Sequence, residues 1–192
     1  MNKIIIILLF ILYVFPVNAG IKYNIKCGSA LAQRAVTVAL SQENVLENKC
    51  NNSGDVLKYL DLFNARAGTP YCAAGIYWCL VQAAKALNYP QNKIPFPKSL
   101  LANSYFDFAK KNGTKSKYQP QKSDLIVWKR RNSIYGHIEI ITKVGEKGWV
   151  ETIGFNTKKQ IKGQTLCGVF KHKRNIFHPL GALNIRGLIG LV

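Results

Sequence analysis

Between residues 29 and 110, apolar residues recur every three or four positions, which is the spacing of one face of a helix. The helices expected from this pattern are residues 29–47, 55–63, 71–87 and 99–110. Ser29 and Asp55 stand where helix N-termini favour a capping side chain, which supports the first two starts. Residues 90–97 contain three prolines and are expected to form an extended loop.

After Pro120 the pattern changes to the two-residue alternation that is typical of strands. The expected strands are residues 125–128, 138–144, 149–153, 168–171 and 185–192. Helices followed by a run of neighbouring strands favour an α+β domain with an antiparallel sheet over a doubly wound fold.

Residues 1–19 have the pattern of a secretory signal peptide. Lys3 precedes an apolar run over residues 4–17, and Ala19 ends a small-x-Ala cleavage site. The run is shorter than the roughly 17–25 apolar residues that span a bilayer. We therefore expect cleavage near Ala19, export to a periplasmic or extracellular location, and no stable membrane insertion afterwards.

The composition fits one globular domain, since 48% of the 192 residues are hydrophobic. The formal net charge is +18, and loss of the leader, which carries one lysine and no acid, leaves +17. A strong positive charge attracts polyanions over long distances. Because the basic residues are scattered and form no nucleic-acid motif, we expect anionic cell-surface polymers and not nucleic acid as partners. The oligomeric state is left open.

The five cysteines are Cys27, Cys50, Cys72, Cys79 and Cys167. An odd number leaves at least one thiol without a partner inside the chain. An oxidising compartment permits disulfides among the others. Cys27 with Cys50 and Cys79 with Cys167 are possible pairs, although spacing alone does not set connectivity.

Cys72 is the candidate nucleophile because it falls in the first turn of an expected helix, behind Pro70. Unpaired amides and the positive end of the helix dipole stabilise a thiolate there. The flanking Tyr71 and Ala73 are expected to lie near the oxyanion or the substrate. The alternative is a small buried core residue, which is what we expect of Cys79.

His137 is the candidate base, since it follows a glycine at the start of an expected strand. The imidazole of a catalytic histidine needs an acceptor that fixes its orientation. We expect Asn156 in this role, with Glu151 as a possible additional acid. His172 and His178 lie in a basic stretch and are expected to be surface or turn residues.

Zinc binding is the rival explanation for cysteines combined with histidine. The gap between Cys72 and Cys79 is longer than structural zinc sites use, and no two histidines are four residues apart. We therefore expect no metal ion and no organic cofactor.

Four segments together resemble the CHAP family of cysteine- and histidine-dependent amidohydrolases and peptidases, above all its small exported members from Bacteroidetes-type bacteria. These segments are residues 68–74, 123–128, 135–138 and 152–157. The resemblance implies a papain-like cysteine peptidase fold of the α+β class, in which N-terminal helices pack on an antiparallel sheet. The resemblance spans residues 55–192, which we expect to be a CHAP-like catalytic domain. With the signal peptide (1–19) and an N-terminal helical segment (20–54), the chain is then expected to have three parts.

The resemblance implies cleavage of an amide bond in peptidoglycan, by an N-acetylmuramoyl-L-alanine amidase or by an endopeptidase of the peptide cross-links. Carried over by motif, Cys72 is the nucleophile, His137 the base and Asn156 the orienting residue. One position departs from the family pattern, because Gly154 stands where members often carry a glutamate.

Two other functions stay open at this point. The absent acid and the charge of +17 are compatible with a non-catalytic, cationic binder of cell-surface polymers on an inactive hydrolase scaffold. A cysteine peptidase that acts on amides outside the cell wall would share the same motifs.

Overall fold

The computed structural model describes residues 20–192, so the expected signal peptide lies outside the described residues. Helices and strands combine in the α+β manner that the sequence predicts. The helices are α1 (Ser29–Leu40), α2 (Leu57–Asp61), α3 (Cys72–Ala86) and α4 (Ala102–Asn112), with short 3₁₀ turns η1 (Gly54–Val56) and η2 (Gln91–Lys93). No helix in this part of the chain has the length and apolar character needed to cross a membrane.

Seven strands form one sheet, in the order β2-β1-β7-β3-β4-β5-β6. They are β1 (Lys22–Ile25), β2 (Thr114–Ser116), β3 (Leu125–Arg130), β4 (Gly136–Val144), β5 (Trp149–Ile161), β6 (Gln164–Asn175) and β7 (Leu183–Leu191). Five of the six pairings between neighbouring strands are antiparallel, but β1 runs parallel to β7. The sheet is therefore mixed, and the expectation of a purely antiparallel sheet was wrong.

The extra strand β1 comes from the segment that was expected to be helical, residues 20–54. Strand β1 pairs with β7 at the other end of the chain, so no local pattern predicts it. Lys22 on this strand is buried, and its Nζ lies 2.6 Å from Oδ2 of Asp124, which is buried as well. The N-terminal segment therefore contributes both α1 and a strand that is part of the central sheet.

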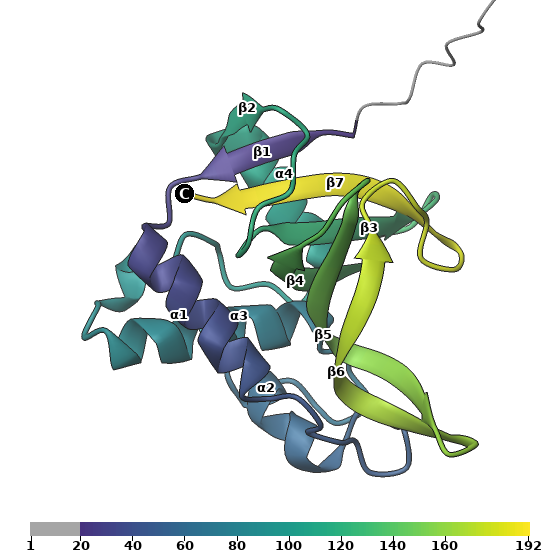
Figure 1. The fold of residues 1–192 in the computed structure, drawn as a ribbon. Coiled ribbons are helices and arrows are strands. Elements are labelled where there is room, and N and C mark those ends of the chain that lie inside the picture. The colour runs from purple at the N-terminus through teal and green to yellow at the C-terminus, as the bar shows by residue number, and fades with distance from the viewer. Residues whose placement is uncertain (1–19) are drawn as a thin grey trace, which may run out of the picture.

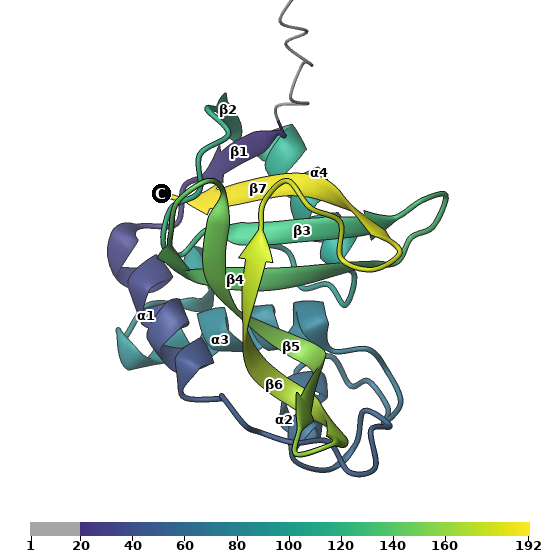
Figure 2. The same ribbon diagram turned by 45° about the vertical axis from the view of Figure 1, so that its right-hand side comes forward.

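Helices α1, α3 and α4 pack against one face of the sheet, and the hairpin of β5 and β6 extends beyond its other strands (Figures 1 and 2). Helix α3 lies very close to β5 where Gly75 faces Phe155. A Cβ at Gly75 would lie only 2.2 Å from the Phe155 ring. Glycine at this position therefore allows the start of α3 to sit on the sheet.

Strands β5 and β6 are longer than expected because a β-bulge replaces the turn predicted near Asn156. The register between the two strands shifts between Gly154 and Thr157, and Asn156 has a φ of 57°. Asparagine tolerates this left-handed conformation better than most residues. Both strands continue past the bulge to a hairpin turn at residues 162–163.

Helix α1 ends at Leu40, before its expected end, and the following segment runs back along β6. The amide of Asn44 donates to the carbonyl of Val169. This path brings Cys50 to Cys167, and the two form a disulfide. Both expected pairings were wrong, since Cys27, Cys72 and Cys79 are free thiols.

Candidate active site

Cys72 is the first residue of α3, as its position behind Pro70 predicts. The residue before it, Tyr71, is fully buried. Its hydroxyl donates to Oε1 of Glu47 at 2.9 Å, and its ring stacks on Tyr59 with centroids 5.7 Å apart. These contacts fix the start of the helix, so the thiol of Cys72 lies among the unpaired amides of a helix N-terminus.

His137 is the second residue of β4, and it is 8% exposed. Its Nε2 lies 3.1 Å from Oε1 of Glu139. Burial disfavours the charged imidazole, but interactions with Cys72 and Glu139 outweigh it and raise the pKa of His137 to about 9. The imidazole of His137 is therefore placed between a thiol and a carboxylate.

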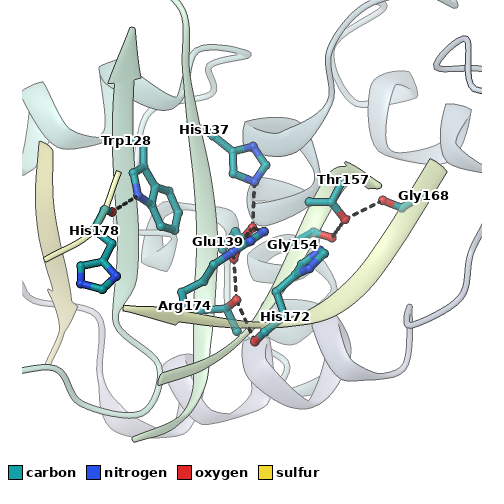
Figure 3. Close-up of polar contacts among 10 residues, drawn as sticks. Trp128, His137, Glu139, Gly154, Thr157, Gly168, His172, Arg174 and His178 are labelled. Atoms are coloured by element: carbon teal, nitrogen blue, oxygen red, sulfur yellow. Dashed lines mark hydrogen bonds and ion pairs between the residues drawn. The ribbon is translucent and has the colours of Figure 1, made fainter. Parts of the chain in front are cut away.

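Glu139 is fully buried and held from several sides (Figure 3). Arg174 donates from Nη2 to Oε1 at 2.6 Å and from Nε to Oε2 at 3.0 Å, and the hydroxyl of Thr152 donates to Oε2. Burial alone would raise the pKa of this carboxyl, but the hydrogen bonds from His137 and Arg174 hold it well below its usual range. Glu139 is therefore a carboxylate at neutral pH.

Gly154 lies directly opposite Glu139 in the ladder of β4 and β5. A Cβ at Gly154 would lie 2.8 Å from Oε1 of Glu139, which is closer than real Cβ atoms approach. The carboxylate of Glu139 thus occupies the space that a side chain at position 154 would need. The acid that is absent from position 154 has a counterpart on the neighbouring strand.

The structure corrects the expected orienting groups. Glu139, and not Asn156, lies on the ring of His137. Asn156 is half-buried at the bulge and lines the same cleft as Cys72. Glu151 is exposed, with Oε1 3.5 Å from Nζ of Lys143, because successive strand residues point to opposite faces and Thr152 faces Glu139.

Glu139 was not among the site residues expected from the sequence, although a signal for it is present there. It lies two residues after His137 on one strand, so both side chains point to the same face. A single acid within the otherwise apolar run 138–141 is also unusual, because an unpaired carboxylate is costly to bury.

Cys72 and His137 open into a cleft of about 540 Å³. Its lining also includes Asn52, Tyr135, Asn156, Thr157, Lys158, His172 and Arg174. Tyr71 and Ala73 are fully buried and their side chains do not line it, so the backbone amides are what these positions can offer a substrate. Within residues 20–192, no cluster of three or more histidine, cysteine or acidic side chains could hold a metal ion.

His172 is half-buried in this cleft and is not the surface residue that the sequence suggested. Burial, with smaller effects from Arg174, His137 and Lys159, lowers the pKa of His172 to about 4, although Glu139 opposes the shift. His178 is exposed, as expected, and its carbonyl accepts a hydrogen bond from Nε1 of Trp128 (Figure 3).

Comparison with known protein families finds a match over the central part of the chain. The family model described as CHAP domain matches residues 64–156, which contain Cys72, His137, Glu139 and Asn156. No curated protein matches the chain. No solved structure matches it either.

Proposed function

Because the family model described as CHAP domain matches residues 64–156, we propose that the protein is an exported peptidoglycan hydrolase with a papain-like fold. The family points generally to amidase or peptidase activity on peptidoglycan. The scissile bond is an amide, either between N-acetylmuramic acid and L-alanine or within the peptide cross-links. One observation carries the proposal, namely that His137 lines an open cleft together with Cys72 and has Glu139 on its ring.

The proposed reaction is acyl transfer through a thioester. With a pKa of about 9, His137 is protonated at neutral pH, and an imidazolium favours the thiolate form of a neighbouring cysteine. The sulfur of Cys72 attacks the amide carbonyl, and the amides at the start of α3 are placed to donate to the oxyanion. His137 then gives its proton to the leaving amine.

The second half of the reaction releases the acyl group. His137, now neutral, takes a proton from a water molecule as that water attacks the thioester carbonyl. The thioester bond breaks, the carboxylic acid leaves, and Cys72 returns to the thiolate beside a protonated His137. Throughout both halves, Glu139 orients the imidazole and stabilises its charged form.

Digestion of purified peptidoglycan by residues 20–192, with mass spectrometry of the soluble fragments, tests this function. We expect new amine and carboxylate ends at one type of amide bond, and none with Cys72→Ala. Cys27→Ser is the matched control, because Cys27 is a free thiol outside the cleft. Equal release of fragments by wild type and Cys72→Ala would exclude the thiol mechanism.

Glu139 weakens the alternative of an inactive scaffold. The absence of an acid at position 154 was one of the two observations that supported that alternative. Thiol alkylation distinguishes a cysteine hydrolase from a non-catalytic binding protein. An activated Cys72 should react with iodoacetamide well below pH 8, whereas the fully buried Cys79 should stay unmodified in the folded protein. Failure of the native protein to react below pH 8 would favour a binding protein over an enzyme.

A further inference from the structure

The wall of the cleft formed by β6 contains a polar atom without a partner. Nε2 of His172 is enclosed by protein, and it makes no hydrogen bond with any of the described residues. Buried polar atoms are nearly always hydrogen-bonded, and leaving one unpaired costs free energy. His172 also lines the cleft, so its ring is in a position to contact a bound ligand.

The charges around this wall favour an anion. Arg174 and Lys158 line the same cleft, and no acidic side chain does so in the described part of the chain. Arg174 uses Nε and Nη2 to hold Glu139, while its Nη1 makes no hydrogen bond with residues 20–192. A guanidinium with a free edge is a strong partner for a carboxylate.

The three groups approach the cleft from neighbouring strands. His172 and Arg174 are two residues apart on β6, so their side chains share the face on which Glu139 lies (Figure 3). Lys158 comes from β5, just beyond the bulge at Asn156. Cys72 and His137 line the same cleft, so a group bound here belongs to the molecule whose amide is attacked.

We propose that His172, Arg174 and Lys158 form a subsite for a carboxylate of the substrate, close to the scissile amide. The inference rests on the proposed function and narrows its substrate class. Peptide stems of cell walls carry carboxylates that are free in some walls and carboxamides in others. The enzyme therefore prefers the stem with the free carboxylate.

A pair of synthetic stem peptides tests the subsite, one with a free glutamate carboxylate and one with the carboxamide in its place. Wild type should show a kcat/KM about tenfold higher for the carboxylate peptide, as expected for one charge-assisted contact. Lys158→Ala and His172→Leu should lose most of this preference, chiefly through KM. Lys159→Ala removes an adjacent charge outside the cleft lining and should retain the preference for the carboxylate peptide.

The ratio between the two peptides is insensitive to a general loss of folding, because a fraction of unfolded protein lowers both rates equally. His172→Gln keeps a polar side chain and should retain more of the preference than His172→Leu. Equal rates for the two peptides with wild type, or an unchanged ratio in both Lys158→Ala and His172→Leu, would overturn the subsite.

Calorimetric binding of the same peptides to Cys72→Ala separates this inference from the proposed function. If wild type cleaves neither peptide but Cys72→Ala binds the carboxylate form about tenfold more tightly, the subsite stands and the hydrolase proposal fails. If wild type cleaves both peptides and Cys72→Ala binds them equally, the hydrolase proposal stands and the subsite fails.

Discussion

At the scale of single residues, the site depends on how a buried carboxylate is kept charged. Glu139 has no exposed surface, so an isolated carboxylate there would be very costly. Arg174 compensates this cost with two donors, and Thr152 adds a third. The negative charge then acts on His137, which is the neighbour whose protonation the mechanism needs.

Glu139→Gln should lower kcat/KM by about 10²–10⁴, because an amide holds the imidazole without stabilising its charge. The pKa of His137 should fall as well, so the loss of activity at high pH should begin below the value of about 9. Rates measured across pH test both effects. Glu151→Gln is the matched control, since Glu151 is exposed, and it should leave the profile unchanged. A Glu139→Gln profile that keeps the wild-type midpoint would contradict the assigned role.

His137 and Glu139 also make the free energy of unfolding depend on pH. His137 has a raised pKa in the folded state, so its contribution is complete below its usual pKa of 6.5 and is lost as pH rises through about 9. Glu139 has a lowered pKa, so its contribution is present above its usual value of 4.5 and is lost in acid. The free energy of unfolding from urea titrations should therefore fall between pH 6.5 and 9 more steeply in wild type than in Glu139→Gln.

The structural positions of Cys72 and His137 could be predicted from the sequence, because each depends on a local pattern that the structure preserves. Cys72 does begin a helix and His137 does begin a strand. The position of Glu139 beside His137 was harder to predict, because it becomes clear only from the pairing between strands. Only the register that puts Gly154 opposite Glu139 shows why one is a glycine and the other an acid.

At the scale of elements, the limits of prediction lie where distant segments meet. The helices α3 and α4 and the strands β3, β4 and β7 follow from their apolar patterns. Strand β1 is recognisable only through its pairing with β7, and the bulge at Asn156 only through its pairing with β6. The disulfide likewise depends on the path of residues 44–47 along β6, which no spacing of cysteines encodes.

Removal of the disulfide should lower stability and weaken substrate binding together. Cys50 and Cys167 are 117 residues apart, and closing so long a loop is expected to contribute about 2–4 kcal/mol. Asn52 in the bridged loop lines the cleft, so KM should rise in the double variant Cys50→Ser/Cys167→Ser. Denaturant titration and peptide kinetics measure the two effects. Cys27→Ser should change neither, and an unaltered KM in the double variant would separate the loop from substrate binding.

At the scale of the whole molecule, the N-terminal strand is part of the sheet and of its charge balance. Lys22 and Asp124 are both nearly inaccessible to solvent and lie 2.6 Å apart. The amide of Gln121 also donates to Asp124. A strand that supplies the partner of a buried charge cannot detach without leaving that charge unpaired.

Lys22→Ala should lower the free energy of unfolding by about 3–5 kcal/mol, which is the usual effect of removing one partner of a buried ion pair. Lys26→Ala, an exposed position just after β1, should have little effect. Thermal denaturation of both variants at neutral pH tests this. If both variants lose the same small amount of stability, β1 is not held by the buried ion pair.

The bond between Cys50 and Cys167 also determines what a proteolytic cut does to the chain. It joins the segment before α3 to strand β6, so Cys72 and His137 both lie inside the covalent ring that it closes. A single cut anywhere in that ring leaves one connected molecule, so neither Cys72 nor His137 can diffuse away with a fragment. Nicked protein should therefore migrate as one species until a reductant is added.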